Sequence, residues 1–141
     1  MKNFNLNRFV EAQESDDMYD VALQEIKQGY KVSHWIWYIF PQHENLGFSY
    51  QSKFFGISCL EEAKAYLLHP VLGKRLKEIS EEILKHADKD IKYILGSVDA
   101  LKLKSSMTLF DKAEPDSVFN VVLETFYNDE KDDITLSLLS E

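Results

Sequence analysis

The segment from Pro70 to Ala87 has the clearest helical periodicity in the chain, and it limits the folds that the chain can adopt. Apolar residues recur there at intervals of three and four, which places them on one side of a helix: Leu72, Leu76, Ile79, Ile83 and Leu84. Charged residues take the other side: Lys74, Lys77, Glu78, Glu81, Glu82 and Lys85. A helix with one apolar side needs a second apolar layer, so the rest of the chain must supply the other half of a core.

The other segments have the same helical character, and single prolines and glycines separate them. We predict a first helix around Phe9 and further helices within these ranges: 17–27, 35–40, 50–55, 59–68, 98–110, 115–127 and 133–139. The apolar run at 35–40 also fits a buried strand, but a lone strand has no partner, so we interpret it as helix. We therefore predict an all-α fold, in which residues 1–141 form a single domain, an orthogonal array of about eight short helices.

Local side-chain patterns predict how several of these helices begin. Ser33 is the expected N-cap of the third helix. Ser58 and Glu61 form a capping-box pattern. The remaining expected start signals are His69 before Pro70, Ser97 after Gly96, and Asp132 or Asp133. Near the N-terminus, Arg8 and Glu11 are spaced for an ion pair along one helix.

Charge argues against several classes of partner. The net charge is −8, and residues 114–141 carry eight acidic side chains against the single base Lys131. The stretch 101–113 is locally basic, but Arg8 and Arg75 are the only arginines in the sequence. An acidic protein repels phosphate backbones unless it concentrates a basic face elsewhere. We expect no binding to nucleic acid and none to membranes.

Other features of the sequence set the expected compartment and exclude common cofactors. Cys59 is the single cysteine, so no internal disulfide forms, as suits a reducing compartment. The most apolar run, Trp35 to Pro41, is far shorter than the roughly 20 residues that cross a bilayer. Zinc-ligand spacings, phosphate-binding glycine loops and dinucleotide fingerprints are absent from the sequence. We expect a cytoplasmic protein with no metal and no cofactor.

Three blocks resemble a known family. They are Arg8–Gln13 (RFVEAQ), Ser33–Gln42 (SHWIWYIFPQ) and Lys102–Phe110 (KLKSSMTLF), with His69–Gly73 (HPVLG) between the last two. Over about Leu6 to Leu139 the chain is similar to the domain of unknown function 1810, a family of small, mainly bacterial proteins that are sometimes labelled calpastatin-like. The resemblance implies a mostly helical single domain and brings no activity. The chain departs from the family pattern after the Pro-Gln pair.

The Ser33–Gln42 block is the first candidate site. Two tryptophans, a tyrosine, a histidine and a glutamine within ten residues can form an aromatic wall with polar tips. A planar ligand would stack on Trp35 or Trp37, while His34 or Gln42 would read its edge. In the alternative interpretation these aromatic residues are core, and their polar atoms bond to nearby backbone.

The Lys102–Phe110 block is the second candidate site. It contains two adjacent hydroxyls, those of Ser105 and Ser106, with Lys102 about one helical turn away. Such a set can bind a phosphate or a carboxylate, or the lysine can activate a serine. In the alternative interpretation they are small residues where helices approach closely, with each hydroxyl bonded back to a carbonyl.

Together the two blocks suggest a pocket for a planar, anionic small molecule such as a nucleotide derivative. Its expected ligand-binding residues are Trp35, Trp37, Gln42, Lys102 and Ser105. If the protein is a hydrolase, His34 is the expected general acid-base and Ser106 the second catalytic residue. The alternative function is a protein-interaction module that uses the acidic C-terminal helices, in which Phe119, Phe126 and Tyr127 alternate with the acids.

Overall fold

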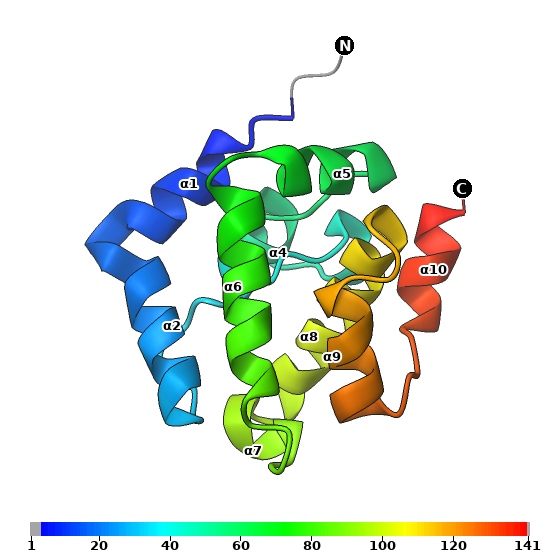
Figure 1. The fold of residues 1–141 in the computed structure, drawn as a ribbon. Coiled ribbons are helices and arrows are strands. Elements are labelled where there is room, and N and C mark those ends of the chain that lie inside the picture. The colour runs from blue at the N-terminus through cyan, green and yellow to red at the C-terminus, as the bar shows by residue number, and fades with distance from the viewer. Residues whose placement is uncertain (1–3, 141) are drawn as a thin grey trace.

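The amphipathic segment predicted at 70–87 forms α6 (Leu72–Leu84), which runs through the middle of the fold (Figure 1). It packs against α2 (Met18–Gln28), α5 (Leu60–Leu68) and α9 (Val118–Tyr127). Four of its five predicted apolar residues are fully buried and Leu84 is partly buried. The predicted two-sided helix is confirmed.

The computed structural model describes residues 4–140, and within that part of the chain it contains helices and no strand. The remaining helices are α1 (Asn7–Glu14), α3 (Ile36–Ile39), α4 (Tyr50–Phe54), α7 (Ile91–Leu95), α8 (Ser97–Ala113) and α10 (Asp133–Leu139). Two 3₁₀ turns lie at Ser15–Asp17 and Glu44–Leu46. The all-α prediction is confirmed, and the run at 35–40 contains a short helix, as predicted, instead of a strand.

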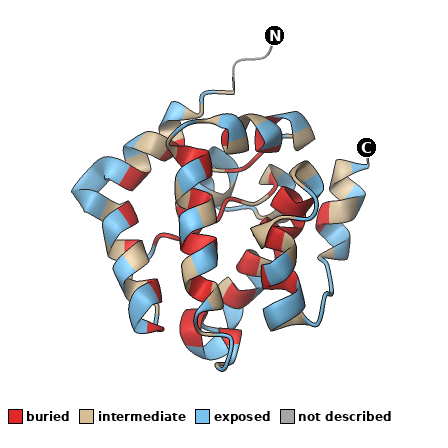
Figure 2. Ribbon diagram, in the orientation of Figure 1, coloured by how far each residue is buried: buried red, intermediate tan, exposed pale blue. Residues whose placement is uncertain are grey.

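The helices surround one core. In Figure 1, α5 lies across the top of α6, with α1 and α2 on one side and α8 to α10 on the other. Figure 2 shows that buried residues face inward on each of these elements. The longest helix, α8, packs against α3, α5, α7, α9 and α10, and its Leu103, Met107 and Phe110 are fully buried. None of the helices in residues 4–140 has the length and apolar character needed to cross a membrane.

The predicted start signals are partly confirmed. His69 Nδ1 accepts hydrogen bonds from the backbone N–H groups of Val71 (3.1 Å) and Leu72 (3.3 Å) at the start of α6, whose N-cap position is Val71. The Asp132 carboxylate accepts from Thr135 N–H at 3.2 Å and caps α10. Ser97 is the first residue of α8, one position after the cap.

The capping-box prediction was wrong by one residue. The helix begins at Leu60 with Cys59 at the N-cap position, so the side chain that reaches back is Glu62 instead of Glu61. Glu62 Oε1 accepts from Ser58 N–H and from the Ser58 hydroxyl, each at 2.8 Å.

The predicted Arg8–Glu11 ion pair was also wrong. Arg8 Nη2 contacts Glu62 Oε2 at 2.9 Å, while Glu11 accepts from Asn7. Arg8 also donates to the carbonyl oxygens of Phe54 (2.7 Å), the last residue of α4, and of Gly56 (2.8 Å), just after it. A guanidinium has five N–H donors, so it is drawn to carbonyls left open where a helix ends. Only the packing of α1 beside α4 and α5 makes them available.

Glu25 on α2 holds the segment that leads into α3. Its Oε1 accepts from Val32 N–H (2.8 Å), Ser33 N–H (2.9 Å) and Trp35 Nε1–H (2.9 Å), and its Oε2 accepts from the Ser33 hydroxyl (2.6 Å). Ser33 therefore does not cap α3, whose N-cap residue is Trp35. The prediction that Ser33 caps α3 was therefore wrong, because the Ser33 hydroxyl donates to Glu25 instead.

These bonds make folding stability depend on the charge of Glu25. Burial tends to raise the pKa of this carboxyl, but the bonds from Ser33, Val32 and Trp35 outweigh it and hold the pKa below its usual value. The stabilisation is therefore present above the unfolded-state pKa of about 4.3 and is lost as pH falls through the lower folded-state pKa.

We expect Glu25→Gln to lower the free energy of unfolding at pH 7 by about 1–3 kcal/mol, because the neutral amide cannot accept all four bonds. Urea unfolding between pH 7 and pH 3 measures this difference, which should shrink at the acid end. Glu61→Gln, at an exposed position, is the control and should change little. A difference that stays constant over the whole pH range would contradict the assignment.

Candidate functional site

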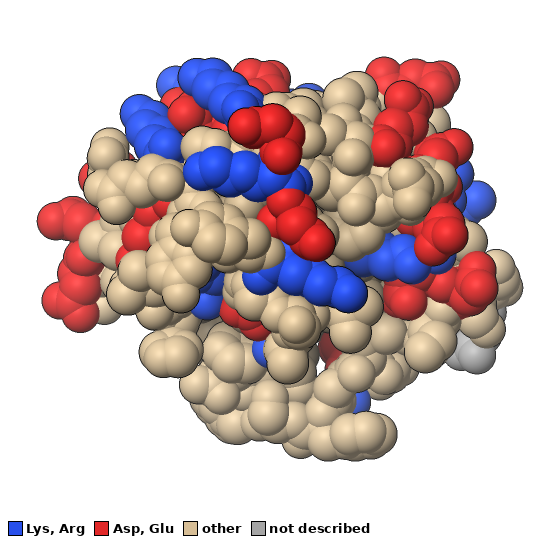
Figure 3. Space-filling model, turned by 90° about the horizontal axis from the view of Figure 1, so that it is seen from below, with Lys and Arg blue, Asp and Glu red and all other residues tan. Residues whose placement is uncertain are grey.

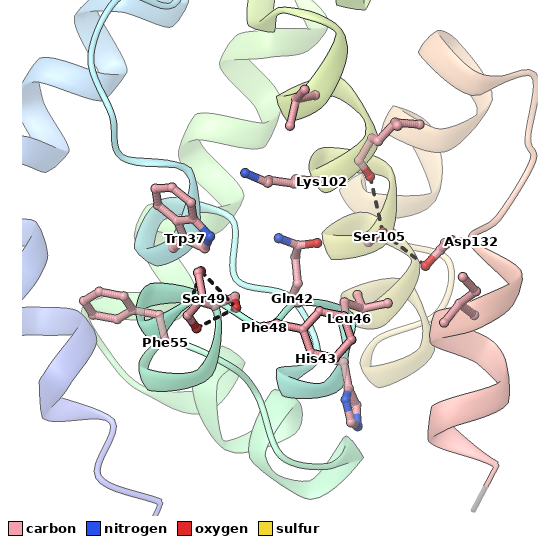
Figure 4. A pocket seen from close by; sticks show the side chains of 15 residues that line it. Trp37, Gln42, His43, Leu46, Phe48, Ser49, Phe55, Lys102, Ser105 and Asp132 are labelled. Carbon is pink, nitrogen blue, oxygen red and sulfur yellow. Dashed lines mark hydrogen bonds between the residues drawn. The ribbon is translucent and has the colours of Figure 1, made fainter.

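A pocket of about 480 Å³ opens between α8 and the chain from Gln42 to Phe55 (Figure 4). We call it the α8 pocket. Its lining comes from α3, from the loop and α4 that follow, from the first turns of α8, and from the start of α10. These residues are Trp37, Gln42, His43, Leu46, Gly47, Phe48, Ser49, Ser52, Phe55, Val98, Leu101, Lys102, Ser105, Asp132 and Ile134.

Four of the seven residues predicted for a site line the α8 pocket: Trp37, Gln42, Lys102 and Ser105. They come from two segments far apart in the sequence, which are joined here because α3 packs against α8. The structure brings these members of the aromatic block and the serine block together around one space.

Two of the predicted residues lie in the core. Trp35 is fully buried and its indole N–H bonds to Glu25, so it offers no wall to a ligand. Ser106 is also fully buried, and its hydroxyl has no hydrogen-bond partner in the described structure. The side chains of consecutive residues on a helix point about 100° apart, so Ser106 faces the core when Ser105 faces the pocket. The catalytic prediction for Ser106 is corrected, because a sealed hydroxyl does not reach a substrate.

His34 lies outside the α8 pocket. It is exposed and lines a neighbouring hollow of about 430 Å³ that also contains Lys31 and Asp99 and shares Trp37 and Lys102 with the α8 pocket. Because α3 begins only at Ile36, His34 belongs to the loop before it. The expected His34–Ser106 pair does not form.

Lys102 supplies the positive charge of the α8 pocket. Its ammonium lies 4.4 Å from the centroid of the Trp37 ring, a cation–π contact, and 3.4 Å from Asp99 Oδ1. Lys31 contacts the other oxygen of Asp99 at 2.8 Å and is only 7% exposed. Because the closer lysine already neutralises much of the Asp99 charge, Lys102 keeps positive charge to offer to a ligand.

Trp37 and Gln42 bring unpaired polar groups to the same place. The Trp37 indole nitrogen and the Gln42 side-chain amide point into the pocket (Figure 4), and neither bonds to another residue in the described part of the chain. The Gln42 backbone is fixed because its carbonyl accepts from Ile57 N–H at 2.8 Å, with Glu44 N–H bonded to the Ile57 carbonyl at 2.9 Å. This short parallel bridge between the loop and residue 57 holds Gln42 against α8.

Asp132 lies across the pocket from Trp37 and had been predicted only as a helix cap. Its Oδ2 lies 3.1 Å from Ser105 Oγ, and its backbone N–H donates to Thr108 Oγ1 at 2.9 Å. The Ser105 hydroxyl also lies 3.2 Å from the Leu101 carbonyl, the back-bond of the alternative interpretation. Ser105 is therefore both a small residue at a helix contact and a partner of a pocket carboxylate.

Large apolar side chains around the pocket are strongly exposed. Phe48 is 95% exposed, and Val98, Leu101 and Ile134 are each more than 60% exposed. Exposed apolar groups gathered around a cavity are typical of a surface that contacts something else. Sequence reasoning did not single out Phe48, which stands in the loop between the 3₁₀ turn at Glu44–Leu46 and α4.

A family model described as a protein of unknown function, DUF1810, matches residues 3–139. The chain belongs to this family. The crystal structure of the conserved hypothetical protein Rv1873 from Mycobacterium tuberculosis is similar to it, with 41% sequence identity, 98% of each chain covered and a TM-score of 0.94. No curated protein matches the chain. The similarity to the crystal structure supports the fold, and neither description states an activity.

Proposed function

We propose that this DUF1810 chain binds a planar, anionic small molecule, such as a nucleotide derivative, in the α8 pocket. The observation that carries the proposal is the convergence of the Trp37 indole N–H, the Gln42 amide and the Lys102 ammonium inside one pocket. The Trp37 indole N–H and the Gln42 amide have no hydrogen-bond partner among the described residues, and unpaired polar groups in a pocket are suited to a ligand. The volume of about 480 Å³ lies in the range of small-molecule sites.

The charged and aromatic residues of the α8 pocket support a ligand that is both anionic and planar. Lys102 attracts an anionic group, and the indole N–H of Trp37 beside it adds a neutral donor. Phe55 and the exposed Phe48 provide aromatic surface for a flat ring. Hydrolysis does not enter the proposal, because His34 and Ser106 do not line this pocket.

Nucleic acid and protein partners are less well supported than a small molecule. On the face seen in Figure 3, lysines and arginines alternate with acidic side chains and form no continuous basic surface. The aromatic residues of the alternative interface are turned inward: Phe119 is fully buried, and Phe126 and Tyr127 pack partly buried against the core. The exposed acidic face therefore lacks the aromatic anchors that interfaces usually use.

We expect Lys102→Gln to weaken ligand binding at least about tenfold, because it removes the cation that pairs with the anionic group. Thermal shift with a panel of nucleoside monophosphates and other planar acids identifies the ligand, and calorimetry gives the dissociation constants. Lys104→Gln is a matched control on the same helix, with a side chain 22% exposed against 24% for Lys102 and an ion pair to Glu130 away from the pocket. The proposal fails if the whole panel produces no shift, or if both variants weaken binding equally.

A further inference from the structure

We infer that the α8 pocket selects a guanine-type base, whose edge carries N–H donors beside a carbonyl, and that Asp132 and Gln42 read this edge. The inference rests on the proposed function and adds the identity of the base to it. It is carried by a carboxylate that is fixed in place, keeps one oxygen free, and lies at the opposite end of the pocket from Lys102.

The Asp132 carboxylate is held rigidly through one oxygen. Its Oδ2 accepts from Thr135 N–H (3.2 Å), from the Thr135 hydroxyl, and from Ser105 Oγ (3.1 Å). Its own backbone N–H is tied to Thr108 Oγ1 on α8. In the described structure Oδ1 has no partner, and Asp132 lines the pocket. Side chains that are held in this way present a fixed hydrogen-bonding group to a ligand.

Helix capping accounts for only part of this arrangement. A cap needs one side-chain oxygen that accepts from the first turn, and Oδ2 fills that role. The bond from Ser105 comes from another helix, α8, and places the carboxylate at the wall of the pocket. An ionised carboxylate only accepts hydrogen bonds. A ligand must therefore meet Oδ1 with an N–H or O–H donor and keep its negative charge at the Lys102 end.

Gln42 provides the complementary group. Its side chain projects between Lys102 and Ser105 in Figure 4, and its backbone is fixed by the bridge to Ile57. An amide carries both N–H donors and a carbonyl acceptor, so it can donate to a ligand carbonyl that lies beside the donors bound by Asp132. Both side chains line the same pocket, where Asp132 offers an acceptor and Gln42 can offer a donor.

Among the common bases, guanine fits this pair best. Its N1–H and N2–H₂ are adjacent donors for Asp132 Oδ1, and its O6 accepts from the Gln42 amide. Adenine places the N1 lone pair beside its amino group, and uracil flanks its N–H with two carbonyls, so in both an acceptor faces the carboxylate. Cytosine offers one amino donor and then an acceptor. A site that leaves a polar group unpaired rejects such ligands strongly.

The test is a comparison of bases in the wild type and in Asp132→Asn. Asparagine caps helices as well as aspartate does, and its carbonyl can keep the Oδ2 bonds, so the fold is retained. Its NH₂ then replaces the free oxygen and donates instead of accepting. We expect wild type to bind GMP at least about tenfold more tightly than AMP or UMP. We expect the variant to lose this preference and to bind XMP, whose 2-oxo group accepts from the new NH₂, more tightly than GMP.

Controls separate this inference from the proposed function. Asp133→Asn, at the exposed neighbouring position, should leave the order of affinities unchanged. Guanosine without phosphate should bind more weakly than GMP but with the same dependence on Asp132. Equal binding of GMP and AMP, or an unchanged preference in Asp132→Asn, would overturn the guanine inference even if Lys102→Gln still weakens binding. A lack of binding by any nucleotide or planar acid would overturn the proposed function as well.

Discussion

Replacing Arg8 by alanine is expected to lower the free energy of unfolding by about 3–5 kcal/mol, the usual cost of removing one partner from a buried ion pair. Glu62 is 2% exposed and Arg8 is 10% exposed, so water does not replace the lost guanidinium. The carbonyls of Phe54 and Gly56 also lose their donor. Urea denaturation followed by circular dichroism measures the change.

Two further variants show which property of Arg8 matters. Arg8→Lys keeps the charge but not the planar fork, so we expect an intermediate loss of stability. Lys85→Ala removes an exposed ion pair to Glu82 and should cost about 0.5 kcal/mol or less. If Arg8→Ala costs no more than Lys85→Ala, the Arg8–Glu62 contact does not stabilise the fold as described.

The Arg8 contacts also affect the proposed site. The carbonyls of Phe54 and Gly56 flank Phe55, which lines the α8 pocket. Arg8 thus connects the stability of α1 to the shape of one pocket wall. We expect Arg8→Lys to weaken ligand binding even at temperatures where the variant is fully folded.

Trp35→Ala is the second variant expected to have a large effect, again about 3–5 kcal/mol, whereas Trp37→Phe should cost less than about 1.5 kcal/mol. Trp35 is fully buried, contacts Phe40, and bonds to Glu25, so truncation leaves a cavity and removes one of the donors to Glu25. Trp37 is half-buried, and phenylalanine keeps most of its ring while removing the indole N–H.

Substitution of Trp35 should therefore lower stability more than ligand binding, and substitution of Trp37 should lower ligand binding more than stability. We expect Trp37→Phe to weaken binding of the ligand with little loss of stability, as shown by urea denaturation and calorimetry on the same samples. We expect Trp35→Phe, if folded, to bind normally. A large loss of stability in Trp37→Phe with unchanged binding would mean that Trp37 is a core residue like Trp35.

The sequence pattern predicted the elements that depend on local interactions. The apolar periodicity of residues 72–84 and the Asp132 cap arise from contacts within a few residues of each other. Such contacts are set by side-chain spacing along one helix, and spacing can be read from the chain.

The sequence predicted only some of the residues that line the site. The Ser33–Gln42 and Lys102–Phe110 blocks are unusual enough in composition to mark Trp37, Gln42, Lys102 and Ser105. The two tryptophans of the first block, Trp35 and Trp37, are only two positions apart in the sequence. The two serines of the second block, Ser105 and Ser106, are adjacent. Only the helix start at Ile36 and the rotation of α8 determine which member of each pair faces the pocket.

By itself, the sequence determined the helical class, most helix positions and the two segments from which the pocket is built, because these follow from short-range periodicity and composition. Only the tertiary structure decided that Arg8 pairs with Glu62, that His34 lies outside the pocket and that Asp132 lines it. These three outcomes depend on how helices distant in sequence pack, and a one-residue shift in a helix start redirects a side chain by about 100°.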